Sequence, residues 1–119
     1  MATLVLMWSM LDGFLNGVAI LGPAGVSATA YLPVAQTAID IVAGWLPGYA
    51  RQADDGVHPA DDGTVDTHLT AMTQVVRESE LLGVNSELPR LIRALAERAA
   101  TAGHGGSGYT ALVEQFRKR

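Results

Sequence analysis

The first fifty residues carry almost no charge, and this limits the possible folds more than any other feature of the sequence. Asp12 and Asp40 are the only charged side chains there, and every Lys and Arg lies from Arg51 onward. The stretch 1–22, MATLVLMWSMLDGFLNGVAILG, is almost entirely apolar. Apolar side chains at this density are stable only when another surface covers them. That surface is lipid, the rest of the chain or a partner protein.

A membrane span is the first of these alternatives. Stretch 1–22 has about the 20 residues that a bilayer requires, and Gly13 and Gly17 have the GxxxG spacing of close helix pairs in lipid. However, Asp12 would lie near the bilayer centre, where a charge costs about 2.5–3.5 kcal/mol on insertion scales. Asn16 is also polar, and neither end has the flanking Lys or Arg of a span or a signal peptide. We therefore favour a soluble helix covered by a protein partner.

Composition excludes several other classes of protein. A chain of 119 residues fits one domain, and 49% hydrophobic against 17% charged residues excludes disorder. The net charge is −4, and the only basic cluster is the terminal tail 117–119, so nucleic-acid binding is not expected. The absence of cysteine excludes disulfides, zinc thiolates and cysteine nucleophiles.

Hydrophobic periodicity predicts an all-α domain, a bundle of about five helices, and no stretch alternates like a strand. Ser27 or Thr29 can cap the second helix, and Thr64 can cap the third. Pro33 is placed in the first turn of the second helix, and Leu46-Pro47-Gly48 is predicted to kink or break it. The predicted helices are 3–20, 31–45 with a short continuation to 54, 65–82, 86–102 and 109–116.

The sequence Gly103-His104-Gly105-Gly106-Ser107-Gly108 matches the letters of a dinucleotide-binding loop. Such a loop must follow a strand and open a helix, with an acidic residue about 20 positions later. Here an amphipathic helix precedes the glycines and the sequence continues for only eleven residues. We interpret 103–108 as a turn between two helices.

Other chemistry-bearing residues give no specific motif. The stretch 54–68 is rich in Asp and His, but it lacks the spacing of an EF-hand loop or of HExxH. Caps and the helix dipole explain these carboxylates, and His68 is interpreted as a hydrogen-bonded structural histidine. Ser, His and Asp are present without a nucleophile elbow. Taken singly, Trp8, Trp45, Tyr49 and Met72 are more typical of a core than of a ligand pocket.

Two segments, ESELLGVNSELPRLIRAL and AGHGGSGYTALVEQFRK, resemble the C-terminal end of imine reductases and reductive aminases. This family belongs to the wider β-hydroxyacid dehydrogenase superfamily. The segment LMWSMLDGFLNGVAILGPAGVSATAYLPVA resembles the family's interdomain helix and the helix after it. The resemblance covers residues 1–119 as a single helical domain, and it implies that the N-terminal Rossmann domain is absent.

The resemblance implies a fold and an assembly. Two such domains intertwine as a homodimer, the apolar first helix of each chain is enclosed by the other, and Gly13 and Gly17 allow close packing. In the complete family, the active site lies between the nucleotide domain of one chain and the helical domain of its partner. NADPH delivers hydride there to the C=N bond of a small imine. The implied location is the cytoplasm.

The resemblance also implies site residues. Leu4, Val5 and Trp8 match positions that face the substrate, and Met72 matches a pocket position on the third helix. Trp45 and Tyr49 match more loosely, around Pro47. The family's proton donor aligns just before Met1, and Asp12 does not match it.

Because the cofactor half is missing, we expect no NADPH binding and no activity from this chain alone, and a Rossmann-domain partner would complete the pocket. The alternative is a structural helical dimerisation module without catalysis.

Overall fold

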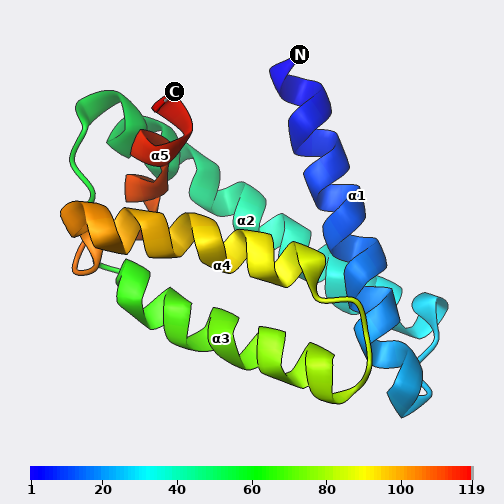
Figure 1. The fold of residues 1–119 in the computed structure, drawn as a ribbon. Coiled ribbons are helices and arrows are strands. Elements are labelled where there is room, and N and C mark those ends of the chain that lie inside the picture. Colours follow the sequence, from blue (N-terminus) through cyan, green and yellow to red (C-terminus); the bar gives the residue numbers. More distant parts are fainter. Residues whose placement is uncertain (119) are drawn as a thin grey trace.

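The computed structural model describes residues 1–118 and is all-α, which confirms the fold class predicted from the sequence (Figure 1). Within those residues there are five α-helices and no strand. Two 3-10 turns and one π-turn connect or extend them. The elements are α1 (Ala2–Leu21), η1 (Gly22–Ala24), α2 (Ala28–Asp55), α3 (Val65–Leu81), α4 (Glu87–Ala99), η2 (Ala100–His104), η3 (Tyr109–Leu112) and α5 (Val113–Arg117).

Two of the helices begin at side-chain caps that the sequence contains. The Ser27 hydroxyl accepts a 3.1 Å hydrogen bond from the Ala30 N–H at the start of α2. The Thr64 hydroxyl accepts one of 3.1 Å from the Thr67 N–H at the start of α3. Each cap satisfies a backbone donor that has no partner inside its helix. The Thr64 cap is confirmed, and Ser27 is the cap of the two proposed for α2.

Helix α2 does not break at its second proline, so of the two outcomes predicted at Leu46-Pro47-Gly48, a kink or a break, the break was wrong. It runs through both Pro33 and Pro47 to Asp55. Pro33 is the sixth residue of the helix, so it does not lie in the first turn. Each proline removes one hydrogen bond from the helical ladder. The helix continues past Pro47 because its last turns are held at Gln52 and Ala53 by the C-terminal segment.

The core lies in the second half of the chain. Helices α3 and α4 pack side by side as an antiparallel pair, and η3 and α5 close over one end of it (Figure 1). The buried cluster consists of Val65, Ala96, Ala99 and Leu112. On α4 the larger Leu91 and Ile92 are exposed, while the small Ala96 faces the core. Small residues there let α4 approach its neighbours closely.

The glycine-rich arm 103–108 holds the start of α3. The carbonyl oxygens of Ser107 and Gly105 accept hydrogen bonds of 2.9 and 3.0 Å from the Val65 and Asp66 N–H groups. The Gly108 N–H donates to the His58 carbonyl at 2.9 Å. The arm therefore satisfies the first backbone donors of a helix. This agrees with its interpretation as a structural turn.

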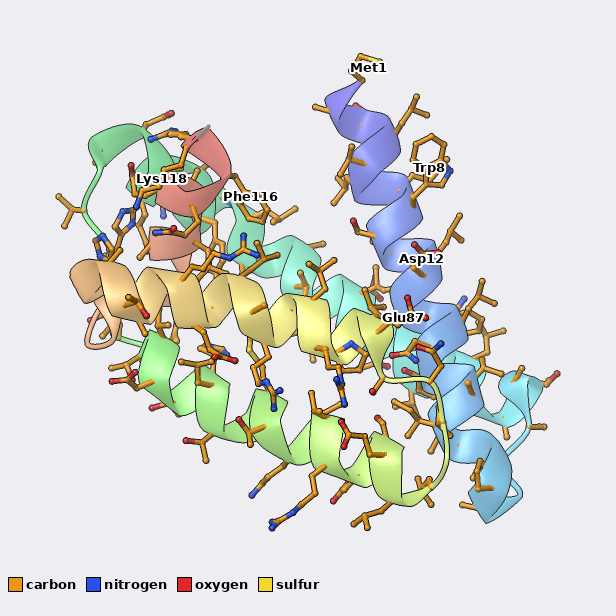
Figure 2. The ribbon with its side chains drawn as sticks, in the orientation of Figure 1. Met1, Trp8, Asp12, Glu87, Phe116 and Lys118 are labelled. Carbon is orange, nitrogen blue, oxygen red and sulfur yellow. The ribbon has the colours of Figure 1, made fainter. Side chains whose placement is uncertain are left out.

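Helix α1 contrasts with this core, because none of its twenty residues is buried. Its N-terminal half projects away from the other helices, with Met1 and Trp8 far from the body (Figure 2). The radius of gyration is 15.2 Å, against about 13–14 Å for a compact domain of this length. Only the other end of α1 contacts the rest of the chain. There Phe14 stacks on Tyr31 of α2 with ring centroids 5.6 Å apart.

Candidate functional site

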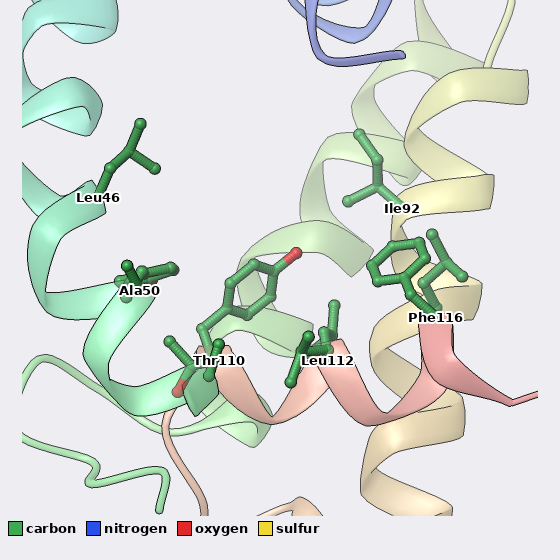
Figure 3. Close-up of a pocket in the computed structure, with 11 residues that line it drawn as sticks. Leu46, Ala50, Ile92, Thr110, Leu112 and Phe116 are labelled. Carbon is green, nitrogen blue, oxygen red and sulfur yellow. The ribbon is translucent and has the colours of Figure 1, made fainter. Parts of the chain in front are cut away.

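A cavity of about 600 Å³ lies between the end of α2, the middle of α4 and the C-terminal segment, and we name it the α2–α5 cavity (Figure 3). Leu46 and Tyr49 line it from α2, and Ile92 and Leu95 line it from α4. Four residues of the C-terminal segment also line it, and they are Tyr109, Leu112, Val113 and Phe116. The cavity is largely apolar, which is typical of a small-molecule pocket and also of a surface for an apolar partner.

A hydrogen-bonded chain holds one wall of this cavity. Thr110 is buried, and its hydroxyl donates to the Gln52 Oε1 at 2.7 Å. The His58 Nδ1 lies 2.9 Å from the same hydroxyl oxygen. Because the Thr110 proton points to Gln52, His58 donates to Thr110 with its Nδ1–H. These bonds join α2, the loop after it and η3, so they fix the segment that closes the cavity.

A second cavity, of about 320 Å³, lies between α1, α3 and α4, and we name it the α1–α3–α4 cavity. His68 and Asn16 are the polar side chains that line it. The remaining residues are apolar or glycine, and they are Gly13, Gly17, Ile20, Ala71, Met72, Val75, Leu88, Pro89 and Ile92. An apolar cavity with a few convergent polar groups is the usual form of a small-molecule site.

His68 connects the two cavities. Its imidazole packs on the Tyr109 ring, with centroids 4.7 Å apart. His68, Tyr109, Tyr49 and Asp62 together line a small space of about 30 Å³, and we name these four residues the His68 cluster. Burial raises the pKa of the Tyr109 phenol, and its neighbour Tyr49 raises it further. Burial and then the Asp62 carboxylate raise the pKa of Tyr49. Both phenols are therefore neutral hydrogen-bonding groups at physiological pH.

The six site residues implied by the resemblance fall into separate places. Tyr49 lines the α2–α5 cavity and Met72 the α1–α3–α4 cavity, and the His68 cluster lies between them. Trp45 is about half exposed on α2. The remaining three lie on the projecting end of α1, with exposed fractions of 43% for Leu4, 63% for Val5 and 55% for Trp8. A single chain does not bring the two groups together.

Sequence reasoning missed His68 and Tyr109 as members of a site. His68 lies four residues before Met72, so the two share one face of α3, and this spacing is a signal in the sequence. Nothing in the sequence indicated that Tyr109 would pack on His68, because that contact joins residues 41 positions apart across the arm.

The described residues do not form a dinucleotide or metal site. A dinucleotide loop presents free backbone N–H groups to phosphates. The arm 103–108 instead turns the carbonyl oxygens of Gly105 and Ser107 toward α3, and no strand precedes it within residues 1–118. No group of three His, Asp or Glu side chains in this range is arranged to hold a metal ion.

The fold and cavities thus define an all-helical domain with apolar pockets. A family model described as the C-terminal domain of NADPH-dependent reductive aminase-like proteins matches residues 1–118. The chain therefore belongs to the NADPH-dependent reductive aminase-like family, as its C-terminal domain.

Individual relatives agree with this assignment. The NADPH-dependent reductive aminase of Aspergillus oryzae (strain ATCC 42149 / RIB 40) is 31% identical over 114 residues, covering 93% of this chain and 39% of that protein. The reductive aminase from Aspergillus terreus, solved in complex with NADPH4, cyclohexanone and allyl amine, superimposes with a TM-score of 0.91 at 33% identity. That match covers 97% of this chain and 41% of the other.

An imine reductase from Bacillus cereus BAG3X2 superimposes with a TM-score of 0.94 over 99% of this chain and 41% of the other. At 24% identity this likeness shows the fold alone. The chain spans about two fifths of the length of these relatives.

Proposed function

We propose that this chain is the dimer-forming and substrate-pocket domain of an NADPH-dependent oxidoreductase that reduces C=N bonds, and that it is inactive alone. One observation carries the proposal: the match of residues 1–118 to the C-terminal domain of a reductive aminase-like family. A relative solved with NADPH4, a ketone and an amine supports the choice of a small imine or amine as substrate. When bound in a separate nucleotide-binding domain, NADPH supplies the hydride. The cytoplasm is the proposed location.

The proposed homodimer is supported by the surface of α1. This helix is long and apolar enough to cross a membrane by its length and composition, and none of its residues is buried within the chain. The same helix lies inside the segment that matches a family of enzymes, so we interpret it as protein-contact surface. Beside it is a groove of about 350 Å³ between α1 and α2, lined by Met7, Leu11, Phe14, Leu32 and Ile39 among others. A two-fold dimer would cover such a surface on both chains at once.

The proposed pocket combines residues from two chains. Leu4, Val5 and Trp8 would come from α1 of one protomer, while Trp45, Tyr49 and Met72 would come from the other. The separation of these two groups within a single chain supports this assignment. The aromatic and apolar side chains would bind the hydrocarbon part of the substrate and exclude water from the reacting C=N bond.

Reconstitution tests the proposal. The chain is mixed with the nucleotide-binding portion of the Aspergillus oryzae relative, and NADPH oxidation is followed with cyclohexanone and allyl amine. We expect no oxidation above background for either part alone and measurable turnover for the mixture. Calorimetry on the chain alone should detect no NADPH binding, and a micromolar Kd there would contradict this expectation.

Sedimentation equilibrium without detergent tests the dimer separately. A species of about 25 kDa, twice the 12.5 kDa of one chain, is expected because apolar surface of this extent favours association. The alternative function is a structural dimerisation module without catalysis. A stable dimer that never supports NADPH oxidation in the mixture would favour that alternative, and a clean monomer would contradict the dimer.

A further inference from the structure

A polar pocket of about 610 Å³ lies where α5 packs on the C-terminal end of α4, and we name it the α4–α5 pocket (Figure 1). Its lining residues are Ala94, Glu97, Arg98, Thr101, Ala102, Gln115 and Lys118. None of these seven residues lines the α2–α5 cavity or the α1–α3–α4 cavity. The α4–α5 pocket is therefore separate from the substrate pocket of the proposed function.

Helix periodicity explains why α4 can line two different spaces. Ala94, Arg98 and Thr101 follow one another at intervals of three or four residues, so they share one side of α4 and η2. Ile92 and Leu95 lie on another side of α4 and line the α2–α5 cavity. A substitution in the α4–α5 pocket therefore leaves the walls of that cavity in place.

Gln115 contributes a buried polar atom that has no partner. Its side-chain Nε2 is shielded from solvent and makes no hydrogen bond within residues 1–118, where it is the only such side-chain nitrogen or oxygen. An unpaired buried donor lowers stability, and in folded proteins it usually indicates a bound water or ion. Because Gln115 lines the α4–α5 pocket and the last torsion of a glutamine side chain is broad, the amide can turn toward the pocket.

Two cations line the same pocket. Arg98 and Lys118 form no ion pair with a carboxylate of residues 1–118. Glu97 is the one carboxylate of the lining, and it is already held by Arg93, with 3.2 Å between the Arg93 Nε and the Glu97 Oε1. The pocket therefore has an excess of positive charge, in a chain whose net charge is −4.

We propose that the α4–α5 pocket binds a phosphate group, as free phosphate or as a phosphate monoester. The Arg98 guanidinium presents paired N–H donors that match phosphate oxygens, and Lys118 adds a second positive charge. The Gln115 amide and the Thr101 hydroxyl supply neutral donors. A phosphate carries a charge of about −1.5 to −2 near pH 7, which balances two cations better than a carboxylate does. This site is independent of the proposed function.

A purely structural explanation covers only part of this arrangement. Arg98 is in the last turn of α4, where a cation interacts favourably with the helix C-terminus. Lys118 belongs to the basic tail 117–119 that follows α5. Neither fact provides a partner for the Gln115 amide. A metal cation fits the pocket less well than an anion, because its one carboxylate is already paired.

The first test titrates the chain with inorganic phosphate or with glycerol 3-phosphate, and sodium chloride of equal ionic strength is the control. Side-chain amide resonances are followed by NMR. We expect the Gln115 resonances to move and saturate with a Kd on the order of millimolar, because solvent screens exposed charges. The amide of Gln74, exposed on α3, should stay in place.

The two probes distinguish the sources of the phosphate group. Movement of the Gln115 resonances with one probe alone identifies the ligand as free phosphate or as a monoester, and movement with both identifies the group that they share. Unmoved Gln115 resonances in both titrations would overturn the inference.

The second test compares two arginine variants. Arg98→Gln should weaken phosphate binding by about tenfold or more, because it removes charge-assisted hydrogen bonds. The matched control Arg77→Gln removes the same charge from an exposed position on α3, outside the pocket, and should change Kd by less than about twofold. Equal Kd values for the two variants would show that phosphate responds only to net charge, and the proposed site would be wrong.

The third test examines the unpaired amide. Gln115→Met keeps an unbranched side chain and removes the donor, so without phosphate the variant should be at least as stable as the wild type. In about 50 mM phosphate, compared with sodium chloride of equal ionic strength, the wild-type melting temperature should rise by about 2–5 °C. The rise should be less than half as large for the variant, and an equal rise in both proteins would contradict a role for Gln115.

None of these measurements uses NADPH or a nucleotide-binding domain. A failed reconstitution would therefore remove the proposed function and leave the phosphate site standing. In the same way, the absence of phosphate binding would leave the proposed function untouched.

Discussion

Residues 1–55 and residues 65–117 of this domain are both helical, but they bury very different numbers of side chains. Residues 65–117 contain Val65, Ala96 and Ala99 at zero exposure, together with the nearly buried Leu112. In residues 1–55 the only buried side chain is Ala35. The second half therefore has a core of its own. The first half leaves most apolar side chains of α1 and many of α2 exposed.

The difference shows what each half contributes. A fully buried Leu, Ile or Met stabilises a fold by about 1.5–3 kcal/mol relative to an exposed one. Most side chains of α1 do not provide this stabilisation in the single chain, because they remain exposed there. The core of α3 and α4 supports both cavities, while α1 presents an exposed apolar surface. The buried core and the exposed apolar surface are thus separated along the sequence.

A Leu→Ala substitution made in each half tests this separation. The expected difference between the two in the free energy of unfolding is the largest effect predicted for this domain. Leu112 is 6% exposed in the core, and Leu15 is 61% exposed on α1. Leu112→Ala should lower the free energy of unfolding by about 2–5 kcal/mol, because it leaves a cavity. Leu15→Ala should change it by less than about 0.5 kcal/mol in the dissociated chain. Urea denaturation at low protein concentration measures both. Equal losses would mean that α1 is buried within the chain.

A second comparison addresses the glycine-rich arm 103–108, which leads from the end of α4 to η3 and contacts the start of α3. A Cβ atom at Gly108 would overlap the Pro59 carbonyl oxygen, so the backbone of the loop or the arm must move. Gly108→Ala should cost about 1–3 kcal/mol, which is typical of overpacking. Gly106→Ala is the matched control, because no atom lies within 4 Å of its Cβ and its φ is not positive. Thermal melts compare them, and equal melting temperatures would contradict this role of the arm.

Much of the fold could be predicted from the sequence because helix periodicity and caps are local. The all-α class, the Thr64 cap and the turn at 103–108 each depend on residues within a few positions. The continuity of α2 through Pro47 could not be predicted in this way. It depends on the hydrogen bonds that Thr110 and Arg117 donate to Gln52 and Ala53, about 60 positions earlier. A local helix-breaking signal was outweighed by tertiary contacts.

The site was less predictable for a related reason. Resemblance to a family indicated Tyr49 and Met72, while residue patterns treated His68 as structural. The cluster that places His68 between two cavities depends on Tyr109, which the arm brings across α3. Leu4, Val5 and Trp8 stay apart from it, because they lie on the exposed, projecting end of α1.

The smallest expected effect concerns two of the three tyrosines, Tyr109 in the second half and Tyr31 in the first. The folded state raises the pKa of Tyr109, chiefly by burial. As pH rises, the unfolded chain therefore loses the Tyr109 proton before the folded chain does. The contribution of the phenol to stability is complete below its ordinary pKa of about 10. That contribution is lost as pH rises through the raised pKa of the folded state. Tyr109→Phe should flatten the fall in melting temperature between about pH 10 and 12. Tyr31→Phe, in the α1–α2 contact, is the control. A melting temperature of Tyr109→Phe that instead falls with rising pH as steeply as that of the wild type would contradict this prediction. That result would mean that the Tyr109 phenol is exposed to solvent and that the second half is packed less tightly than its buried core indicates.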